Sequence, residues 1–188
     1  MASWIQERSP IMSNILSPTL GMSLSDLDVL VVDDNAKMRH LIRIILQSFG
    51  VANIRQARDG PAALAEINSK CPSIIISDWE MEPMNGLEFL QSVRSVFRDP
   101  LCLVPIIVLT GHASKPLIKK AFDAGATQLL VKPVTPANVL QRVNWVLEDD
   151  RPFMRVGNIY RQDMSIERSQ GTSDAPPAAQ SDEIWALD

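Results

Sequence analysis

The sequence predicts an α/β domain in which a parallel sheet of five strands is covered by helices on both faces. Short apolar runs rich in β-branched residues recur along the chain, and each is followed by apolar residues at helical spacing. Four of these runs end on polar groups, which a parallel sheet would gather along a single edge. We therefore predict a doubly wound (βα)5 domain with its functional site at that edge.

Length, charge and cysteine content exclude several classes of protein. The 188 residues allow one ordinary domain with extensions, and a formal net charge of −4 gives no general attraction to nucleic acid or anionic lipid. The two cysteines form neither a CxxC motif nor a cluster with histidine, which argues against a zinc site and a disulfide scaffold. No apolar run approaches the roughly 20 residues that a membrane-spanning helix requires. We expect a cytoplasmic protein that binds neither nucleic acid nor membrane.

Two strand and helix pairs are expected in the first third of the chain. Residues 28–33 are the first strand, and residues 37–49 have apolar side chains at helical spacing before a terminating glycine. Residues 52–57 form a weaker strand whose polar side chains suit the edge of a sheet. The sequence Asp59-Gly60-Pro61 then opens a second helix.

The third pair contains the most apolar strand. Residues 74–76 are three isoleucines, and the strand that they begin ends in Asp78. This pattern is typical of a strand that is buried on both faces and carries an acid at its tip. Asn85, with Glu88 three positions later, is a capping-box signature for a helix that apolar spacing extends to Phe97.

Two further pairs complete the pattern. Residues 106–109 are a fourth strand, and a proline starts a helix at 116–122 that ends before a glycine. Residues 126–131 are the fifth strand, and a Thr-Pro pair begins a last helix at 136–147. The second strand is the polar one, and a strand order of 2-1-3-4-5, with this strand at an edge, fits that distribution.

The regular pattern covers residues 27–149, which we predict to be the domain. Residues 1–26 are expected to be an extension that is either disordered or docked as a short helix. Residues 150–188 are too polar to bury a core and are predicted to be a flexible tail. An apolar patch within residues 182–188 has two interpretations, as stray terminal residues or as a docking peptide.

Polar groups that end the apolar strands are expected to meet at one edge of the sheet. Asp33 and Asp34 follow the first strand, Asp78 the third, Thr110 the fourth and Lys132 the fifth. Three carboxylates this close repel one another unless a cation neutralises them. Oxygen ligands at an open site select Mg²⁺ or Mn²⁺, which share their remaining positions with water and phosphate. We therefore predict a divalent metal site that holds a phosphoryl group.

Asp78 is the predicted nucleophile. It stands alone at the end of the central strand, so its carboxylate can attack phosphorus in line and form an acyl phosphate. The Lys132 ammonium and the Thr110 hydroxyl suit the phosphoryl oxygens. Taken singly, each of these residues is more simply explained as a cap or turn residue. Their combination in this order and spacing favours a site.

The motifs resemble the receiver domain of two-component response regulators over residues 27–149. The resemblance rests on Leu30-Val31-Val32-Asp33-Asp34-Asn35, on Asp78-x-x-Met81 with Pro83, Met84 and Gly86, on Thr110-Gly111-His112 and on Lys132-Pro133. It implies a flavodoxin-like fold, which has the same strand order, 2-1-3-4-5. It also implies that Asp78 accepts a phosphoryl group from a histidine kinase or a histidine phosphotransfer protein.

The resemblance assigns further roles within the site. The metal ligands would be Asp33, Asp34, Asp78 and the backbone carbonyl of Glu80. Thr110 and Lys132 would contact the phosphoryl group, and the Lys132-Pro133 peptide would be cis.

Some positions depart from the family pattern or have two interpretations. Proline usually follows the loop methionine directly, whereas here Glu82 intervenes before Pro83. The fifth strand usually carries Tyr or Phe three residues before the lysine, a ring that moves inward on activation; that switch position is Leu129 here, so the aromatic switch is in question. Glu80 and His112 are candidates for tuning the lifetime of the acyl phosphate, with solvated loop residues as the alternative.

Output is expected through protein contact. Residues 150–188 are too few and too polar for a DNA-binding or catalytic output domain. The fourth helix, fifth strand and fifth helix, which carry Leu117, Leu129 and Trp145, are the expected contact face, with phosphorylation shifting a population of conformers. Two alternatives stay open: a phosphatase that turns over external substrates through an aspartyl intermediate, and a receiver-like interaction domain that is not phosphorylated.

Overall fold

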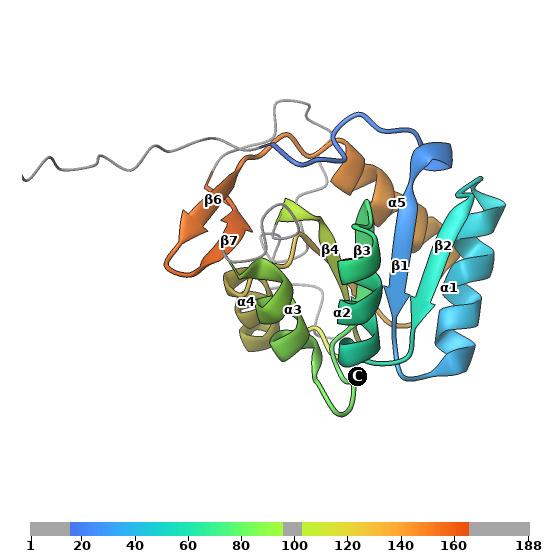
Figure 1. Cartoon of the computed structure of the whole chain (residues 1–188), viewed down its shortest axis with the longest axis horizontal. Coiled ribbons are helices and arrows are strands. Elements are labelled where there is room, and N and C mark those ends of the chain that lie inside the picture. The colour runs from blue at the N-terminus through green and yellow to red at the C-terminus, as the bar shows by residue number, and fades with distance from the viewer. Residues whose placement is uncertain (1–15, 96–102, 166–188) are drawn as a thin grey trace, which may run out of the picture.

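The computed structural model describes residues 16–95 and 103–165, and its centre is a five-stranded parallel sheet (Figure 1). The order β2-β1-β3-β4-β5 confirms the prediction. The strands are β1 (Asp28–Val32), β2 (Asn53–Ala57), β3 (Ile74–Asp78), β4 (Ile106–Thr110) and β5 (Gln128–Val131). Val32 of β1 lies opposite Ser77 of β3, so Asp33 and Asp78 emerge side by side.

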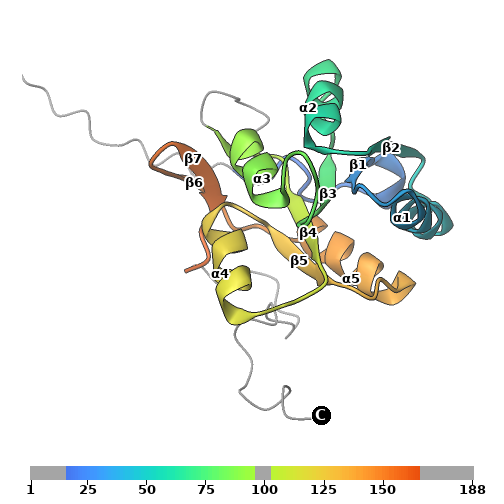
Figure 2. The same cartoon turned by 90° about the horizontal axis from the view of Figure 1, so that it is seen from below.

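Five α-helices follow the five strands and cover both faces of the sheet (Figure 2). They are α1 (Ala36–Ser48), α2 (Gly60–Ser69), α3 (Gly86–Arg94), α4 (Lys115–Asp123) and α5 (Pro136–Leu147). Helices α1 and α5 lie on one face, and α2, α3 and α4 on the other. No helix within residues 16–95 and 103–165 is both long and apolar enough to span a membrane. Phe97, where we expected α3 to end, lies outside the described residues.

Each of these helices begins at a polar N-cap. The cap side chains accept backbone N–H groups of the first turn, which satisfies donors that a helix leaves unpaired. The caps are Asn35, Asp59, Asn85, Ser114 and Thr135. The predicted start signals at Asp59, Asn85 and Thr135 are therefore confirmed, and the five caps fix where each connection leaves the sheet edge.

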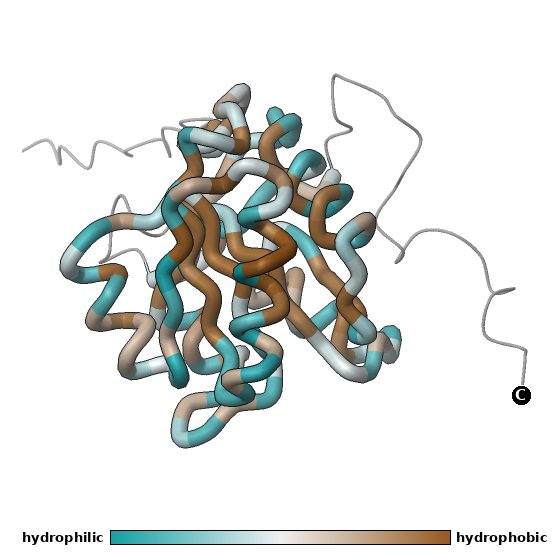
Figure 3. Tube along the Cα trace, turned by 90° about the vertical axis from the view of Figure 1, so that its right-hand side faces the viewer, coloured by the Kyte–Doolittle hydropathy of each residue, from teal (hydrophilic) through white to brown (hydrophobic). Residues whose placement is uncertain are grey.

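Alternate residues of the strands supply two cores, one under each layer of helices. Leu30 and Val32 pack with the core below α2, α3 and α4, whereas Val29 and Val31 pack with the core below α1 and α5. Strands β1 and β3 are buried along their whole length, which explains why their sequences are apolar without alternation. Hydrophobic residues accordingly concentrate in the central strands (Figure 3).

Residues 153–162, which we expected within a flexible tail, form a β-hairpin of β6 (Phe153–Val156) and β7 (Ile159–Gln162). Gly157, at a φ of 63°, and Asn158 connect the two strands. The hairpin lies beside α3 and α4, and Phe153 is 1% exposed. For these residues the prediction was wrong, because a tight turn and one buried aromatic side chain stabilise a hairpin on an existing core. Residues 166–188 lie outside the described part of the chain.

The described part of the N-terminal extension lies against the domain. The Gly21 N–H donates to the Leu147 carbonyl oxygen at 2.9 Å, and the side chains of Ser17 and Thr19 are buried. Residues Leu24–Asp26 form a short 3-10 helix, η1, directly before β1. Residues 16–26 therefore match the docked alternative.

Candidate functional site

Three carboxylates meet at the carboxyl edge of the sheet. Asp33 and Asp34 follow β1, and Asp78 is the last residue of β3; one oxygen from each lies within 4.8 Å of the others. Asp33 and Asp78 are 0% and 4% exposed, whereas Asp34 faces solvent. The cluster is therefore buried on the sheet side and open on the other.

Lys132 supplies a positive charge from the connection after β5. Its Nζ donates to Asp78 Oδ2 at 2.9 Å and lies 3.7 Å from Asp33 Oδ2. The Lys132 N–H donates to the Thr110 carbonyl oxygen at 2.8 Å, and the following peptide bond to Pro133 is cis, as the resemblance implies. One ammonium thus faces three carboxylates, and the cluster keeps a negative charge when all three are ionised.

Burial and the neighbouring acids shift the proton equilibria of the cluster. Burial raises the pKa of Asp33, and the charges of Asp78 and Asp34 add to this rise, although the Asn35 N–H and Lys132 oppose it. Burial lowers the pKa of Lys132, but the hydrogen bond and the charge of Asp78, helped by Asp33, outweigh burial and raise the pKa above its ordinary value. Lys132 therefore stays charged, whereas its neighbours do not fully offset the unfavourable burial of an ionised Asp33 carboxylate.

The donor set fits a divalent cation. Asp33 Oδ1 accepts the Asn35 N–H at 2.7 Å, but the buried Asp33 Oδ2 accepts no hydrogen bond from any described residue. A buried carboxylate oxygen without a donor is unfavourable unless a cation or water binds it. Oxygen atoms from three carboxylates are the ligands that select Mg²⁺ or Mn²⁺. The residues present are therefore able to hold such an ion.

The connection from β3 to α3 fixes the Asp78 backbone and side chain. The Trp79 N–H donates to Asp78 Oδ1 at 2.9 Å, and the Gly86 N–H donates to the Trp79 carbonyl oxygen at 2.9 Å. Gly86 approaches β3 so closely that a Cβ at this position would lie 2.6 Å from the Asp78 carbonyl oxygen. The Glu82–Pro83 peptide, at the departure from the family pattern, is also cis.

A cavity of about 630 Å³ lies beside the acids. Asp34, Glu80 and Glu82 contribute carboxylates to its lining, and Lys120 of α4 contributes an ammonium. Sequence reasoning missed Lys120, because a lysine on an exposed helix carries no signal by itself. Its place in this lining depends on how α4 packs beside the connection after β3.

The other predicted site residues, Thr110, Glu80 and His112, differ in burial and in their contacts. The Thr110 hydroxyl donates to the His112 carbonyl oxygen at 3.0 Å and accepts the His112 N–H at 3.2 Å. Contact with a phosphoryl group therefore requires this hydroxyl to turn away from His112. Glu80 and His112 are exposed, and only Glu80 lines the cavity. Their effect on the acyl phosphate lifetime stays a prediction.

Leu129, at the switch position, is 3% exposed and packs in the same core as Ile118 and Ala121 of α4. Its side chain has no ring that could move between an exposed and a buried position. Any signal that passes through this position would therefore act by repacking of α4.

A sequence model of the response regulator receiver domain matches residues 29–144. The chain belongs to this family. Chemotaxis protein CheY-3 of Vibrio cholerae is 28% identical to the receiver domain over 123 residues, which are 65% of this chain and 93% of that protein. Chemotaxis protein CheY of Pseudomonas aeruginosa is 32% identical over 120 residues, which are 64% of this chain and 95% of that protein.

Solved structures of receiver domains have the same fold. CheY4 of Vibrio cholerae is similar with a TM-score of 0.61 and 35% identity, over 64% of this chain and 98% of that chain. A receiver protein of Pseudomonas putida gives a TM-score of 0.55 and 28% identity, over 62% of this chain and 93% of that chain. As a receiver domain, the protein is a signalling switch rather than an enzyme that turns over external substrates.

Proposed function

We propose that transfer of a phosphoryl group to Asp78 switches this receiver domain. The observation that carries the proposal is the 2.9 Å contact of Lys132 Nζ with Asp78 Oδ2, beside the carboxylates of Asp33 and Asp34. None of these acids is the N-cap of a helix in the described ranges. Turn contacts occupy one oxygen each of Asp33 and Asp78, which accept the N–H groups of Asn35 and Trp79, but they do not involve Asp34 or Lys132. Phosphoryl chemistry uses all four residues.

The transfer that we propose is a single displacement. A carboxylate oxygen of Asp78 attacks phosphorus of a phosphohistidine; a P–O bond forms as the P–N bond breaks, and the imidazole takes up a proton as it leaves. Contacts with the Trp79 N–H and the Lys132 ammonium hold the Asp78 carboxylate in one orientation. Lys132 then pairs with the phosphoryl group, joined by the Thr110 hydroxyl after it turns away from His112.

The proposed transfer requires a divalent cation. Mg²⁺, or Mn²⁺, held by Asp33, Asp34, Asp78 and the backbone carbonyl of Glu80, would neutralise the acids and bind a phosphoryl oxygen. The acidic cluster and the buried Asp33 Oδ2, which accepts no hydrogen bond from the described residues, support this role. The side chains alone present one ammonium against three carboxylates, a balance that repels an incoming phosphoryl group.

The partners that we propose follow from the family. The phosphoryl donor is a histidine kinase or a histidine phosphotransfer protein, and the output is contact with a downstream protein at α4, β5 and α5. One expected member of that face, Trp145, is only 6% exposed: it packs in the core below α1 and α5, and the Arg151 guanidinium lies 4.8 Å from the centre of its ring. A partner would therefore contact α4 and the exposed residues around Trp145. A cytoplasmic location stays a prediction.

Intact-mass measurement tests the proposed function. The full chain is incubated with Mg²⁺ and a small acyl phosphate donor, as wild type, Asp78→Asn and Asp59→Asn. We expect wild type and Asp59→Asn to gain the mass of one phosphoryl group, because Asp59 only caps α2, and Asp78→Asn to gain none. Equal gain in Asp78→Asn, or no gain in wild type with either this donor or a phosphorylated histidine phosphotransfer protein, would contradict the proposal.

A further inference from the structure

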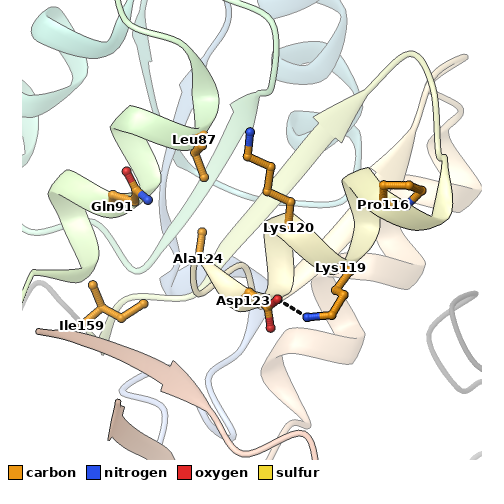
Figure 4. Close-up of a pocket in the computed structure, with 8 residues that line it drawn as sticks. All are labelled: Leu87, Gln91, Pro116, Lys119, Lys120, Asp123, Ala124 and Ile159. Atoms are coloured by element: carbon orange, nitrogen blue, oxygen red, sulfur yellow. Dashed lines mark hydrogen bonds and ion pairs between the residues drawn. The ribbon is translucent and has the colours of Figure 1, made fainter. Parts of the chain in front are cut away.

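A groove lies between α3 and α4 and continues to the hairpin (Figure 4). Its volume is about 420 Å³, and Leu87 of α3, Ala124 after α4 and Ile159 of β7 contribute apolar surface. Leu87 and Lys120 also line the cavity beside the acids. The groove therefore starts next to the acid cavity and leads away from it toward the hairpin.

The rim of the groove is basic. Lys119 and Lys120 of α4 line it, and Lys120 extends into the space between the two helices (Figure 4). Asp123 is the one carboxylate of the lining, and it already pairs with Lys119 and with Arg161 of β7, the latter at 3.1 Å. The Lys120 ammonium pairs with no residue in the described ranges. Three cations around one acid, beside apolar surface, suit a short peptide that carries both carboxylates and large apolar side chains.

We propose that residues 182–188 of the same chain occupy this groove. Their sequence, Asp182-Glu183-Ile184-Trp185-Ala186-Leu187-Asp188, has three carboxylates around an isoleucine, a tryptophan and a leucine. Charge and hydrophobicity of this segment therefore complement those of the groove. The segment itself lies outside the described residues, and a docked position would cover the α3–α4 face beside the acid cavity.

The connecting chain is long enough for this position. Strand β7, which contributes Ile159 to the groove, ends at Gln162, so the chain leaves the fold near the hairpin end of the groove. Residues 166–181 then connect Ser165 to the segment. Any flexible chain of this length would have an end-to-end distance of about 20–24 Å. Fully extended, they reach roughly 50 Å.

Tethering makes weak binding sufficient. A flexible linker of this length gives an effective concentration on the order of 1 mM, so a segment that binds with a dissociation constant near 0.1 mM would be bound roughly 90% of the time. At that population, amide exchange of residues 183–187 would be slowed about tenfold relative to the free peptide. Docking at this population would therefore be measurable by hydrogen exchange.

Amide hydrogen exchange and NMR of the full chain test the proposal. In wild type we expect about tenfold protection of residues 183–187. The variant Trp185→Ala should lose most of this protection and shift amides at Leu87, Ala124 and Ile159. Trp4→Ala, a tryptophan change at the other end of the chain, should leave these amides unchanged. Trp4 and Trp185 both lie outside the described residues, and circular dichroism of each variant checks that the fold is retained.

A change of charge in the groove provides a second test of the proposal. Lys120→Glu should abolish the protection, whereas Lys37→Glu, the same change on an exposed position of α1, should preserve it. Free exchange of residues 183–187 in wild type would overturn the proposal. So would protection that rises with protein concentration, which would mean docking between two copies, and so would amide shifts in Trp185→Ala that fall outside the groove.

Discussion

The carboxylate of Asp33 is the least compensated group of the acid cluster. It is 0% exposed, its Oδ2 accepts no hydrogen bond from the described residues, and burial followed by the neighbouring acids raises its pKa. A folded-state pKa above that of the unfolded chain favours the protonated form. Ionisation of Asp33 at neutral pH therefore opposes folding until a cation binds.

Asp33→Asn should stabilise the domain when divalent cations are chelated. An unfolded aspartate titrates near pH 4, at about 3.9. As pH rises from there through the higher folded-state pKa, wild type should lose stability relative to the variant. At pH 7 we expect a gain of roughly 1 kcal/mol for Asp33→Asn, measured by urea unfolding. Asp59→Asn serves as the charge control, and a difference that did not grow with pH would contradict this account.

Gly86 positions Asp78 through the absence of a side chain. A Cβ there would lie 2.6 Å from both the Asp78 carbonyl oxygen and the Trp79 Cα, which are backbone atoms that cannot yield easily. We expect Gly86→Ala to lower the free energy of unfolding by roughly 2–3 kcal/mol and to displace the acid. Gly60→Ala is the comparison at another helix start; its Cβ would lie 2.6–2.9 Å from side-chain atoms of Met84 rather than from backbone atoms, so we expect a smaller effect. Equal effects of the two changes on stability and on Asp78 phosphorylation would contradict the account.

The positions of the strand-end residues were predictable from the sequence, but the orientation of the Thr110 hydroxyl was not. Asp33, Asp78 and Lys132 lie together because the parallel strands that carry them end at the same edge. The Thr110 hydroxyl instead bonds to the backbone of His112, a choice made by the conformation of the connection after β4. The spacing of residues in the sequence gives no information on the rotation of this side chain.

At the scale of elements, Arg94 connects α3 to the sheet and to the hairpin. It is 0% exposed, and its guanidinium donates to the Gly125 carbonyl oxygen at 2.7 Å and to the Val104 carbonyl oxygen at 2.6 Å. The same guanidinium lies 5.1 Å from the centre of the Phe153 ring. One buried side chain therefore joins four segments that are distant in sequence.

Arg94→Met should destabilise the domain by roughly 3 kcal/mol, because methionine fills the space but leaves the buried carbonyl oxygens without donors. Hydrogen exchange should show the loss first at β6 and β7. Arg58→Met is the control, since the Arg58 side chain is 81% exposed. If chemical unfolding gave similar values for the two variants, Arg94 would not have the role described here.

The sequence predicted an element well where neighbouring residues determine its structure, and poorly where contacts with distant segments determine it. The helix caps and the apolar strands were predicted because each is a local pattern. Arg94 stands four residues after the buried Leu90, on the buried side of α3, but its acceptors come from segments that no local pattern connects to it. The hairpin was missed although Gly157-Asn158 between two short runs is a turn signal.

At the scale of the whole molecule, the fold gathers charges that no single element could bring together. The strand order places β1, β3, β4 and β5 next to one another, and their carboxyl ends contribute the acids, the hydroxyl and the ammonium. In Figure 1 the N-terminal segment lies at the end of the sheet opposite the strand tips that carry the acids, and the hairpin lies beside α3 and α4. The strand order was predictable because the polar second strand suits an edge and because the resemblance to receiver domains implies the order 2-1-3-4-5; the packing of the extensions was not.

We expect this edge to become competent for phosphoryl transfer only when a divalent cation offsets its acids. Intact mass after incubation with a small acyl phosphate donor, with Mg²⁺ or with a chelator, measures this most directly. We expect one phosphoryl group in wild type with Mg²⁺, almost none with the chelator, and almost none in Asp34→Asn under either condition. Phosphorylation of wild type to the same extent with the chelator, or of Asp34→Asn at the wild-type rate, would contradict it.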